Sequence, residues 1–210
     1  MNIEVAVAAY KEFCQALNID LTKPDTIGTP RRVVRMFAKE FLVGGGDHRD
    51  SFQFTTFPVS DHQKDQLVIE TGIRFVSLCA HHHLPIVGTA HVGYLPNERL
   101  AGLSKLARAV KWVAKTPTVQ ETLLVSIRDM LVDHLNPRFI AVSMAGSHQC
   151  MACRGVMEPG ALMINNCFWV NPDAKGEDGE STHHKADYES TKQEFFRAID
   201  HWFKYTMRAQ

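Results

Sequence analysis

The chain has 210 residues, of which 23 are Lys or Arg and 23 are Asp or Glu, so its formal net charge is zero. This length fits one globular domain with a substantial core. A balanced charge gives no electrostatic reason to expect a nucleic acid or an anionic membrane as partner, so any anion binding must be local. No stretch is apolar enough to span a bilayer, and the start lacks the basic and unbroken apolar regions of a signal peptide.

The five cysteines are an odd number, which favours metal ligation or burial over a disulfide framework and fits a cytoplasmic protein. Cys14 lies between apolar positions of the first expected helix, over residues 3–17, and is expected in the core. A second helix is expected to begin at Thr29, acting as N-cap, with Pro30 in its first turn. With the turn cluster at 44–50, these elements make a helical N-terminal segment over residues 1–50.

Residues 51–210 are expected to form the rest of a single globular domain. β-Branched and aromatic residues with partial alternation predict strands, within 51–59, 66–78, 85–96, 138–146 and 161–170. Helical periodicity covers 102–115 and 118–135. A polar, Gly-containing loop over 171–187 resembles an exposed insertion, and a final helix spans 188–203. Strands with helices grouped between them favour an α+β fold over a doubly wound parallel sheet.

The densest chemistry directly follows the second expected strand, where Cys79 and His82 have a spacing that lets both side chains reach one ion. A distant segment, 148–153, reads HQCMAC and can supply further ligands, such as Cys150. Soft sulfur and borderline nitrogen donors together indicate zinc. A solvated loop is the alternative interpretation of three consecutive histidines, but the neighbouring Cys79 and the distant HxCxxC argue against it.

The spacing alone leaves a second alternative open, a closed structural zinc site. Its four ligands would be Cys79, His82, Cys150 and Cys153. Two further imidazoles, His81 and His148, weigh against it, because a purely structural site does not need additional titratable groups beside its ligands.

Basic residues gather on one face of the helix expected over 102–115. Ser104, Lys105 and Arg108 fall together, opposite an apolar stripe. That stripe consists of Leu103, Leu106, Ala107, Val110 and Val113. A helix start offers free backbone N–H groups to a phosphate, and Lys105 and Arg108 add charge, although an ordinary solvated face remains the alternative. Two further arginines, Arg32 and Arg154, are candidates for the same role.

The next expected helix carries Gln120 near the centre of an apolar stripe, where a buried polar group needs a partner. Glu121 lies to one side of that stripe. Its carboxylate could accept from the N–H and amino groups of a guanine edge, or it could be a solvated first-turn acid stabilised by the helix dipole.

Taken together, five segments in roughly residues 10–156 resemble the motifs of the GTP cyclohydrolase I family, which read TPxRxAKM, CEHH, GLSKxxR, VQERL and HxCxxxRG. In this chain they are Thr29-Pro30-Arg31-Arg32, Cys79-Ala80-His81-His82, Gly102-Leu103-Ser104-Lys105-Leu106-Ala107-Arg108, Val119-Gln120-Glu121-Thr122-Leu123 and His148-Gln149-Cys150-Met151-Ala152-Cys153-Arg154-Gly155. The chain departs from the family at Ala80, which replaces the glutamate of CEHH, at His83 and Cys153, and after Gly155.

The resemblance implies roles for these residues. It makes Cys79, His82 and Cys150 zinc ligands and makes His81 and His148 acid/base residues. It assigns the triphosphate to Arg32, Ser104, Lys105, Arg108 and Arg154, and the guanine to Gln120 and Glu121.

The resemblance also implies a fold and a reaction. The fold is the tunnelling fold, with N-terminal helices and then a small antiparallel sheet that carries two helices on one face. Subunits join edge to edge into pentameric barrels, two barrels form a homodecamer, and active sites lie between subunits. The reaction is hydrolysis of the guanine ring of GTP at C8, with loss of formate, to 7,8-dihydroneopterin triphosphate. Alternatives are a zinc hydrolase on this scaffold that stops at a ring-opened formamide or uses another purine nucleotide, and a non-catalytic zinc-stabilised oligomer.

Overall fold

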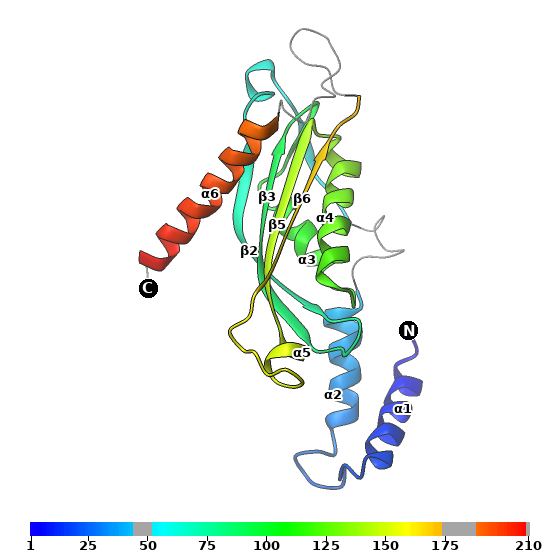
Figure 1. The fold of residues 1–210 in the computed structure, drawn as a ribbon. Helices are drawn as coiled ribbons and strands as arrows, with labels where there is room; N and C mark the ends of the chain where they lie inside the picture. Colours follow the sequence, from blue (N-terminus) through cyan, green and yellow to red (C-terminus); the bar gives the residue numbers. More distant parts are fainter. Residues whose placement is uncertain (44–51, 174–187, 209–210) are drawn as a thin grey trace.

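A four-stranded antiparallel sheet forms the centre of the structure, with helices on both of its faces (Figure 1). The computed structural model describes residues 1–43, 52–173 and 188–208. The strands, in spatial order, are β2 (Val68–Leu78), β3 (Pro85–Leu95), β5 (Phe139–His148) and β6 (Met163–Val170). Every neighbouring pair is antiparallel. The expected α+β class is therefore confirmed.

Helices α3 (Lys105–Val113) and α4 (Gln120–Leu135) cover one face of this sheet, as expected. Helix α6 (Glu189–Arg208) packs on the other face, and Figure 1 shows it beside β2. Strand β5 separates the two cores, because alternate residues of a strand point to opposite faces. Ile140 therefore packs with α3 and α4, whereas Phe139 packs with α6.

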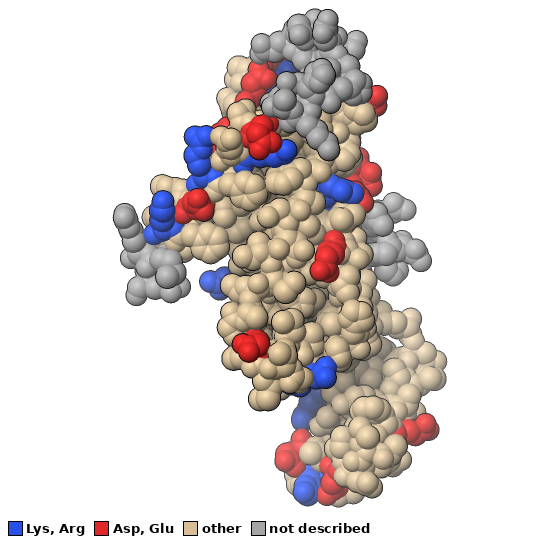
Figure 2. Space-filling view, in the orientation of Figure 1, with Lys and Arg blue, Asp and Glu red and all other residues tan. Residues whose placement is uncertain are grey.

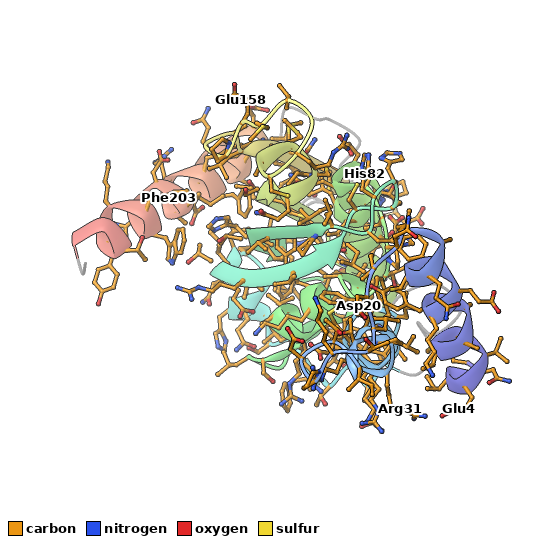
Figure 3. All side chains as sticks on the ribbon, turned by 90° about the horizontal axis from the view of Figure 1, so that it is seen from below. Glu4, Asp20, Arg31, His82, Glu158 and Phe203 are labelled. Atoms are coloured by element: carbon orange, nitrogen blue, oxygen red, sulfur yellow. The ribbon has the colours of Figure 1, made fainter. Side chains whose placement is uncertain are left out.

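The N-terminal helices form a pair that projects from one end of the sheet (Figure 1). Helix α1 spans Ile3–Ala16, and α2 spans Thr29–Met36 and continues into the π-helical turn η1, Phe37–Phe41. An ion pair of 2.8 Å between Arg31 and Glu4, both labelled in Figure 3, joins α1 to α2. Cys14 is 1% exposed, so its expected burial is confirmed.

The expected cap of the second helix is wrong by one residue. Gly28 is the N-cap of α2, and Thr29 already lies inside the helix. No side chain caps this end. Pro30 occupies the first turn as expected, where its missing N–H costs no intrahelical hydrogen bond.

The strand expected over 51–59 is much shorter and lies outside the main sheet. Within the described part of the chain, strand β1 (Thr56–Pro58) pairs with β4 (Arg99–Ala101) alone, in a separate two-stranded ribbon. The aromatic residues before β1 instead pack against the core beside α3, so their apolar character reflects burial and not strand pairing.

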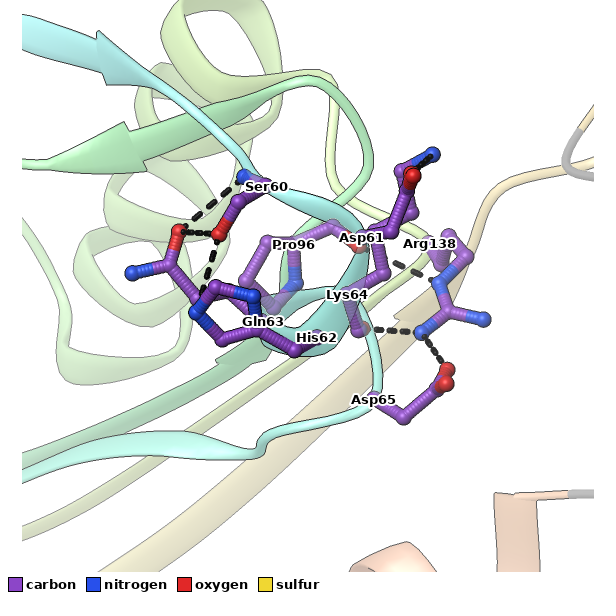
Figure 4. A network of polar contacts seen from close by, with 8 residues as sticks. All are labelled: Ser60, Asp61, His62, Gln63, Lys64, Asp65, Pro96 and Arg138. Atoms are coloured by element: carbon purple, nitrogen blue, oxygen red, sulfur yellow. Dashed lines mark hydrogen bonds and ion pairs between the residues drawn. The ribbon is translucent and has the colours of Figure 1, made fainter.

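Arg138 fastens the segment between β1 and β2 to the end of the main sheet (Figure 4). Its Nε donates to the carbonyl of Pro96 at 3.1 Å, and its Nη2 donates to the carbonyl of Lys64 and to Asp65 Oδ1, the latter at 2.6 Å. The short 3-10 helix η3, Asp61–Gln63, lies in the same segment. This network fixes the sheet end opposite the one that carries the candidate metal ligands.

Helix α3 begins later than the periodicity predicted. Lys105 is its first residue, after a turn in which the Lys105 N–H donates to the carbonyl of Gly102 at 2.7 Å. Leu103 lies in that turn and is 99% exposed, so its assignment to the apolar stripe is wrong. The chain must turn between β4 and α3, and this turn takes Leu103 out of the helical register.

Two expected features lie outside the described residues, the turn at 44–50 and the loop from residue 174 to 187. Within the described ranges, no helix combines the length and the apolar character that a membrane crossing requires. Figure 2 shows acidic and basic side chains interspersed on the visible face, in keeping with the zero net charge of the sequence.

Candidate metal centre

The register of the sheet brings the two distant ligand segments together. Leu78, the last residue of β2, pairs with Pro85, and Ile86 pairs with His148, the last residue of β5. The loop after β2 and the segment after β5 therefore leave the sheet at the same end. Backbone hydrogen bonds fix the start of this loop, with the Cys79 N–H donating to the carbonyl of Leu84 at 2.9 Å.

The segment after β5 turns into a short helix, α5, which spans Gln149–Ala152. The HxCxxxRG motif therefore begins at the last residue of β5, His148, and continues through this helix. The helical turn places Cys150 beside Cys79, which is 4% exposed at the end of β2. Continuation of β5 would have carried Cys150 past the end of β3 instead.

Three side chains form a group with the geometry of a metal site. Ligand atoms of Cys79, His82 and Cys150 all lie within 4.8 Å of one another. The Sγ of Cys79 is 3.9 Å from Nδ1 of His82, which Figure 3 labels on the loop after β2. Tetrahedral zinc, with bonds of about 2.3 Å to sulfur and 2.0–2.1 Å to nitrogen, separates its ligand atoms by roughly 3.6–3.8 Å. The donor set and spacing therefore fit zinc after a small contraction.

The surroundings of the Cys150 thiol disfavour its charged form, and a bound cation would reverse this effect. Burial is the largest of the effects that raise the pKa of the Cys150 thiol, and the hydrogen bond with Cys79 and the charge of Cys79 raise it further. Two neighbouring thiols resist losing both protons when no positive charge lies between them. A divalent ion supplies that charge and stabilises both thiolates.

Two neighbouring side chains lie outside this three-residue group. Cys153 is exposed, and its thiol donates to the carbonyl of Gln149 at 2.8 Å. Nδ1 of His81 also lies 3.9 Å from Sγ of Cys79, but His81 is not part of the group whose ligand atoms all lie within 4.8 Å of one another. Among the described residues the geometry thus favours three protein ligands over the closed site that includes Cys153.

His148 lies next to the group and is held by a buried amide. Its Nε2 is 3.0 Å from Oε1 of Gln120, which is 1% exposed. Nε2 of Gln120 donates to the carbonyl of Met163 and to Oδ1 of Asn165, each at 2.8 Å. The expected burial of Gln120 and its need for partners are both confirmed.

The electrostatic surroundings of His148 act in opposite directions. Burial lowers the pKa of this imidazole, and the nearby charge of Glu121 partly raises it. Glu121 is exposed in the first turn of α4. An imidazole with these neighbours is neutral at pH 7 and can accept a proton.

Arg154 reaches the metal group from the segment after α5. Its Nη1 donates to Nε2 of His82 at 2.8 Å. The other ring nitrogen of His82, Nδ1, faces Cys79. The two nitrogens of this imidazole therefore contact different parts of the site.

The remaining expected anion-binding residues lie elsewhere in the chain. The nine residues of α3 give this helix a length of about 13 Å. After its C-terminal end the chain reaches Thr118, which forms a β-bridge with Cys79. The first turn of α3, with Lys105 and the nearby residues Ser104 and Arg108, is thus at the far end of the helix. Lys105 Nζ donates to the carbonyl of Gln53 at 2.9 Å.

Arg32 also lies apart from the metal group, near the start of α2. Its guanidinium folds back toward the carbonyl of Asp25 at 3.5 Å. Among the described contacts, none joins Arg32, Lys105 or Arg108 to the candidate ligands.

Sequence reasoning missed the contribution of strand β6 to the site. Asn165 contacts Gln120 from this strand, and Gly146 provides the space for that contact, since a Cβ there would lie 2.5 Å from Oε1 of Gln120. The available signal was the Asn165-Asn166 pair within an otherwise apolar strand. A polar residue on a strand face that packs against a helix requires a partner.

The group of Cys79, His82 and Cys150 has the composition of a metal site, and further titratable side chains lie beside it. A family model described as GTP cyclohydrolase I matches residues 6–182. GTP cyclohydrolase 1 of Streptococcus pyogenes serotype M49 (strain NZ131) is 41% identical over 165 residues, which cover 78% of this chain and 83% of the relative. The relative from serotype M5 (strain Manfredo) is 39% identical with the same coverage. The chain belongs to the GTP cyclohydrolase I family.

A solved structure, the apo form of the archaeosine synthase QueF-Like, is 15% identical to this chain. The alignment covers 49% of this chain and 91% of that one, with a TM-score of 0.39. This likeness is too weak to establish a shared fold.

Proposed function

We propose that the protein is a zinc-dependent GTP cyclohydrolase I, which opens the guanine ring of GTP at C8 and releases formate to give 7,8-dihydroneopterin triphosphate. The observation that carries the proposal is the Cys79, His82 and Cys150 group, with His148 beside it, in a chain of this family. Cytoplasmic location belongs to the proposal, because a reducing compartment keeps Cys79 and Cys150 available as ligands.

In this proposal Cys79, His82 and Cys150 would hold the metal. When bound, zinc lowers the pKa of water toward about 7 and so supplies a nucleophile at neutral pH. His148 and His81 flank the site and move protons during ring opening and later ring closure. The lowered pKa of His148 supports its role, because a neutral imidazole can accept the first proton.

Arg154 is proposed to hold phosphate after it leaves His82. A neutral imidazole has one lone pair, so if His82 used that of Nδ1 to hold the metal, its Nε2 would carry hydrogen. Nε2 would then no longer accept from Arg154, and the guanidinium would be available to a triphosphate. Glu121, exposed near His148, is proposed to bind the guanine edge. Gln120, which the resemblance also assigns to the guanine, has its buried amide bonded to Met163, Asn165 and His148, so we propose that it acts through His148 instead.

The distance between the two halves of the expected site supports an oligomeric enzyme. The metal half lies at the C-terminal end of α3 and the basic half, with Ser104, Lys105 and Arg108, at its start. We propose that a neighbouring subunit brings its basic half to this metal half, in a homodecamer of two pentameric barrels with the tunnelling fold. Arg32 is proposed to join the same phosphate site.

Incubation of zinc-replete protein with GTP, followed by measurement of formate and pterin together, tests the proposal. Formate and pterin in equal amounts are expected. A ring-opened formamide without pterin would replace the full reaction by the shorter one, and the absence of both products would contradict an enzyme that acts on GTP.

The roles of the two histidines are tested separately. His81→Ala and His148→Ala are each expected to keep zinc, lose pterin formation and accumulate a formylated intermediate, because proton transfers after ring opening become slow. Wild-type turnover in either variant would contradict the acid/base role of that residue.

A further inference from the structure

The donor and acceptor roles in the hydrogen bonds of the Gln120 amide follow from one partner, the backbone carbonyl of Met163. A backbone carbonyl can only accept, so the amide nitrogen of Gln120 must face Met163, at 2.8 Å. The carbonyl oxygen of the same amide must then face His148, at 3.0 Å. Nε2 of His148 therefore carries hydrogen and donates, and Nδ1 keeps its lone pair.

Asn165 completes this arrangement, because Gln120 has a second amide hydrogen that also requires an acceptor. Oδ1 of Asn165 accepts it at 2.8 Å. Met163 and Asn165 are two residues apart on β6, so both approach Gln120 from the same strand. Without Asn165 a buried N–H would lose its partner, and the amide would gain by rotating toward another acceptor.

The adjacent strand provides the space that this geometry needs. Gly146 of β5 pairs with Met163, and a Cβ at this position would lie 2.5 Å from Oε1 of Gln120. Three elements, β5, β6 and the start of α4, thus meet around one carboxamide. Among the contacts of the described residues, the polar contact that joins this carboxamide to a residue proposed to carry the reaction is the one with His148.

We propose that Asn165 is a positioning residue, which holds the Gln120 amide so that His148 donates from Nε2 and presents Nδ1 as its free acceptor to the substrate. This inference deepens the proposed function and rests on it, since it concerns how His148 is prepared for the reaction. Asn165 itself does not touch the substrate in this account.

Two substitutions at one position separate an acceptor role from simple packing. Asn165→Leu keeps the approximate size of the side chain and removes the acceptor, whereas Asn165→Asp keeps an acceptor oxygen. Asn166→Leu is the matched control, because Asn166 is the next residue, is exposed and points to the opposite face of β6.

We expect Asn165→Leu to lower kcat by roughly ten-fold or more, as part of the 10²–10⁴-fold that a positioned acid/base group supplies. The KM for GTP and the zinc content should stay within about two-fold of wild type, because Asn165 contacts neither in this account. Asn165→Asp should recover most of the turnover, and Asn166→Leu should match wild type. Full turnover in Asn165→Leu, or an equal loss in the leucine and aspartate variants, would overturn the proposal.

A second measurement keeps the inference separate from the proposed activity. Long-range ¹H–¹⁵N NMR of protein with labelled histidine reports which ring nitrogen carries hydrogen, with the His148 signals assigned by their loss in His148→Gln. Wild type should show hydrogen on Nε2 of His148, and Asn165→Leu should show a mixture or the reverse. An Nδ1–H form in wild type would refute the inference, whether or not the protein converts GTP. Absence of formate from GTP together with the expected NMR result would refute the proposed function alone.

Discussion

Replacement of Gly146 by alanine gives a stability change that can be worked from the structure. The added Cβ would lie 2.5 Å from Oε1 of Gln120 and 3.2 Å from Cγ2 of Ile86. The amide is the flexible end of a side chain, so it moves while the backbone stays. Moving it breaks up to three hydrogen bonds, each with a net value of about 0.5–1.5 kcal/mol, or about 3 kcal/mol together.

Part of this loss is offset, because alanine in a strand is more favourable than glycine by roughly 0.5–1 kcal/mol. The expected net loss is therefore about 2 kcal/mol, which for a chain of this size lowers Tm by roughly 4–8 °C. Thermal unfolding followed by circular dichroism measures this change. The control is Gly160→Ala, since a Cβ at Gly160 meets nothing within 4 Å. If both variants melt with wild type, the buried position of the Gln120 amide is not as described.

Three further predictions concern the metal, the phosphates and pH. Metal analysis should find no zinc in each of three ligand variants, Cys79→Ser, His82→Ala and Cys150→Ser. The variant Cys153→Ala should keep one zinc per chain. Loss of zinc from Cys153→Ala would favour a closed site with four protein ligands. Lys105→Ala and Arg108→Ala should each weaken GTP binding roughly ten-fold and guanosine binding little, because only GTP has the charged phosphates. Titration calorimetry measures both affinities. Equal effects on the two ligands would argue against a phosphate role. Burial lowers the pKa of His91 to about 4, so the unfolded chain binds the additional proton. The free energy of unfolding therefore decreases by roughly 3 kcal/mol as the pH falls from 6.5 toward 4, and His91 causes no such loss above pH 6.5. Denaturant titrations of wild type should show this loss, and those of His91→Phe should show less; parallel pH profiles would contradict it.

The periodicity of the sequence predicted most of the secondary structure, because long amphipathic helices and apolar strands carry strong local signals. Helix α1 and strands β2 and β3 lie within a few residues of their expected bounds. Predictions from local sequence patterns were wrong where contacts with the rest of the fold determine the conformation. Leu103 fits an apolar stripe by spacing, yet the turn before α3 exposes it.

The ligand segments of the site were visible in the sequence, but their surroundings were not. Cys79, His82 and Cys150 stand out because cysteine and histidine at these spacings have few structural explanations. The bond between Asn165 and Gln120 joins residues 45 apart in the chain, so no local pattern reports it. The separation of Lys105 from the metal group is also a property of the fold, because it depends on the direction of α3.

The placement of the two half-sites at opposite ends of α3 has a genetic consequence. If one subunit supplies the metal half and its neighbour supplies the basic half, a defect in Cys150 and a defect in Lys105 damage different halves of each site. Oligomers assembled from both inactive chains then contain some interfaces at which an intact metal half meets an intact basic half. Two alleles that fail separately should therefore complement each other when they are expressed in one cell, and chains that carry both changes should complement neither.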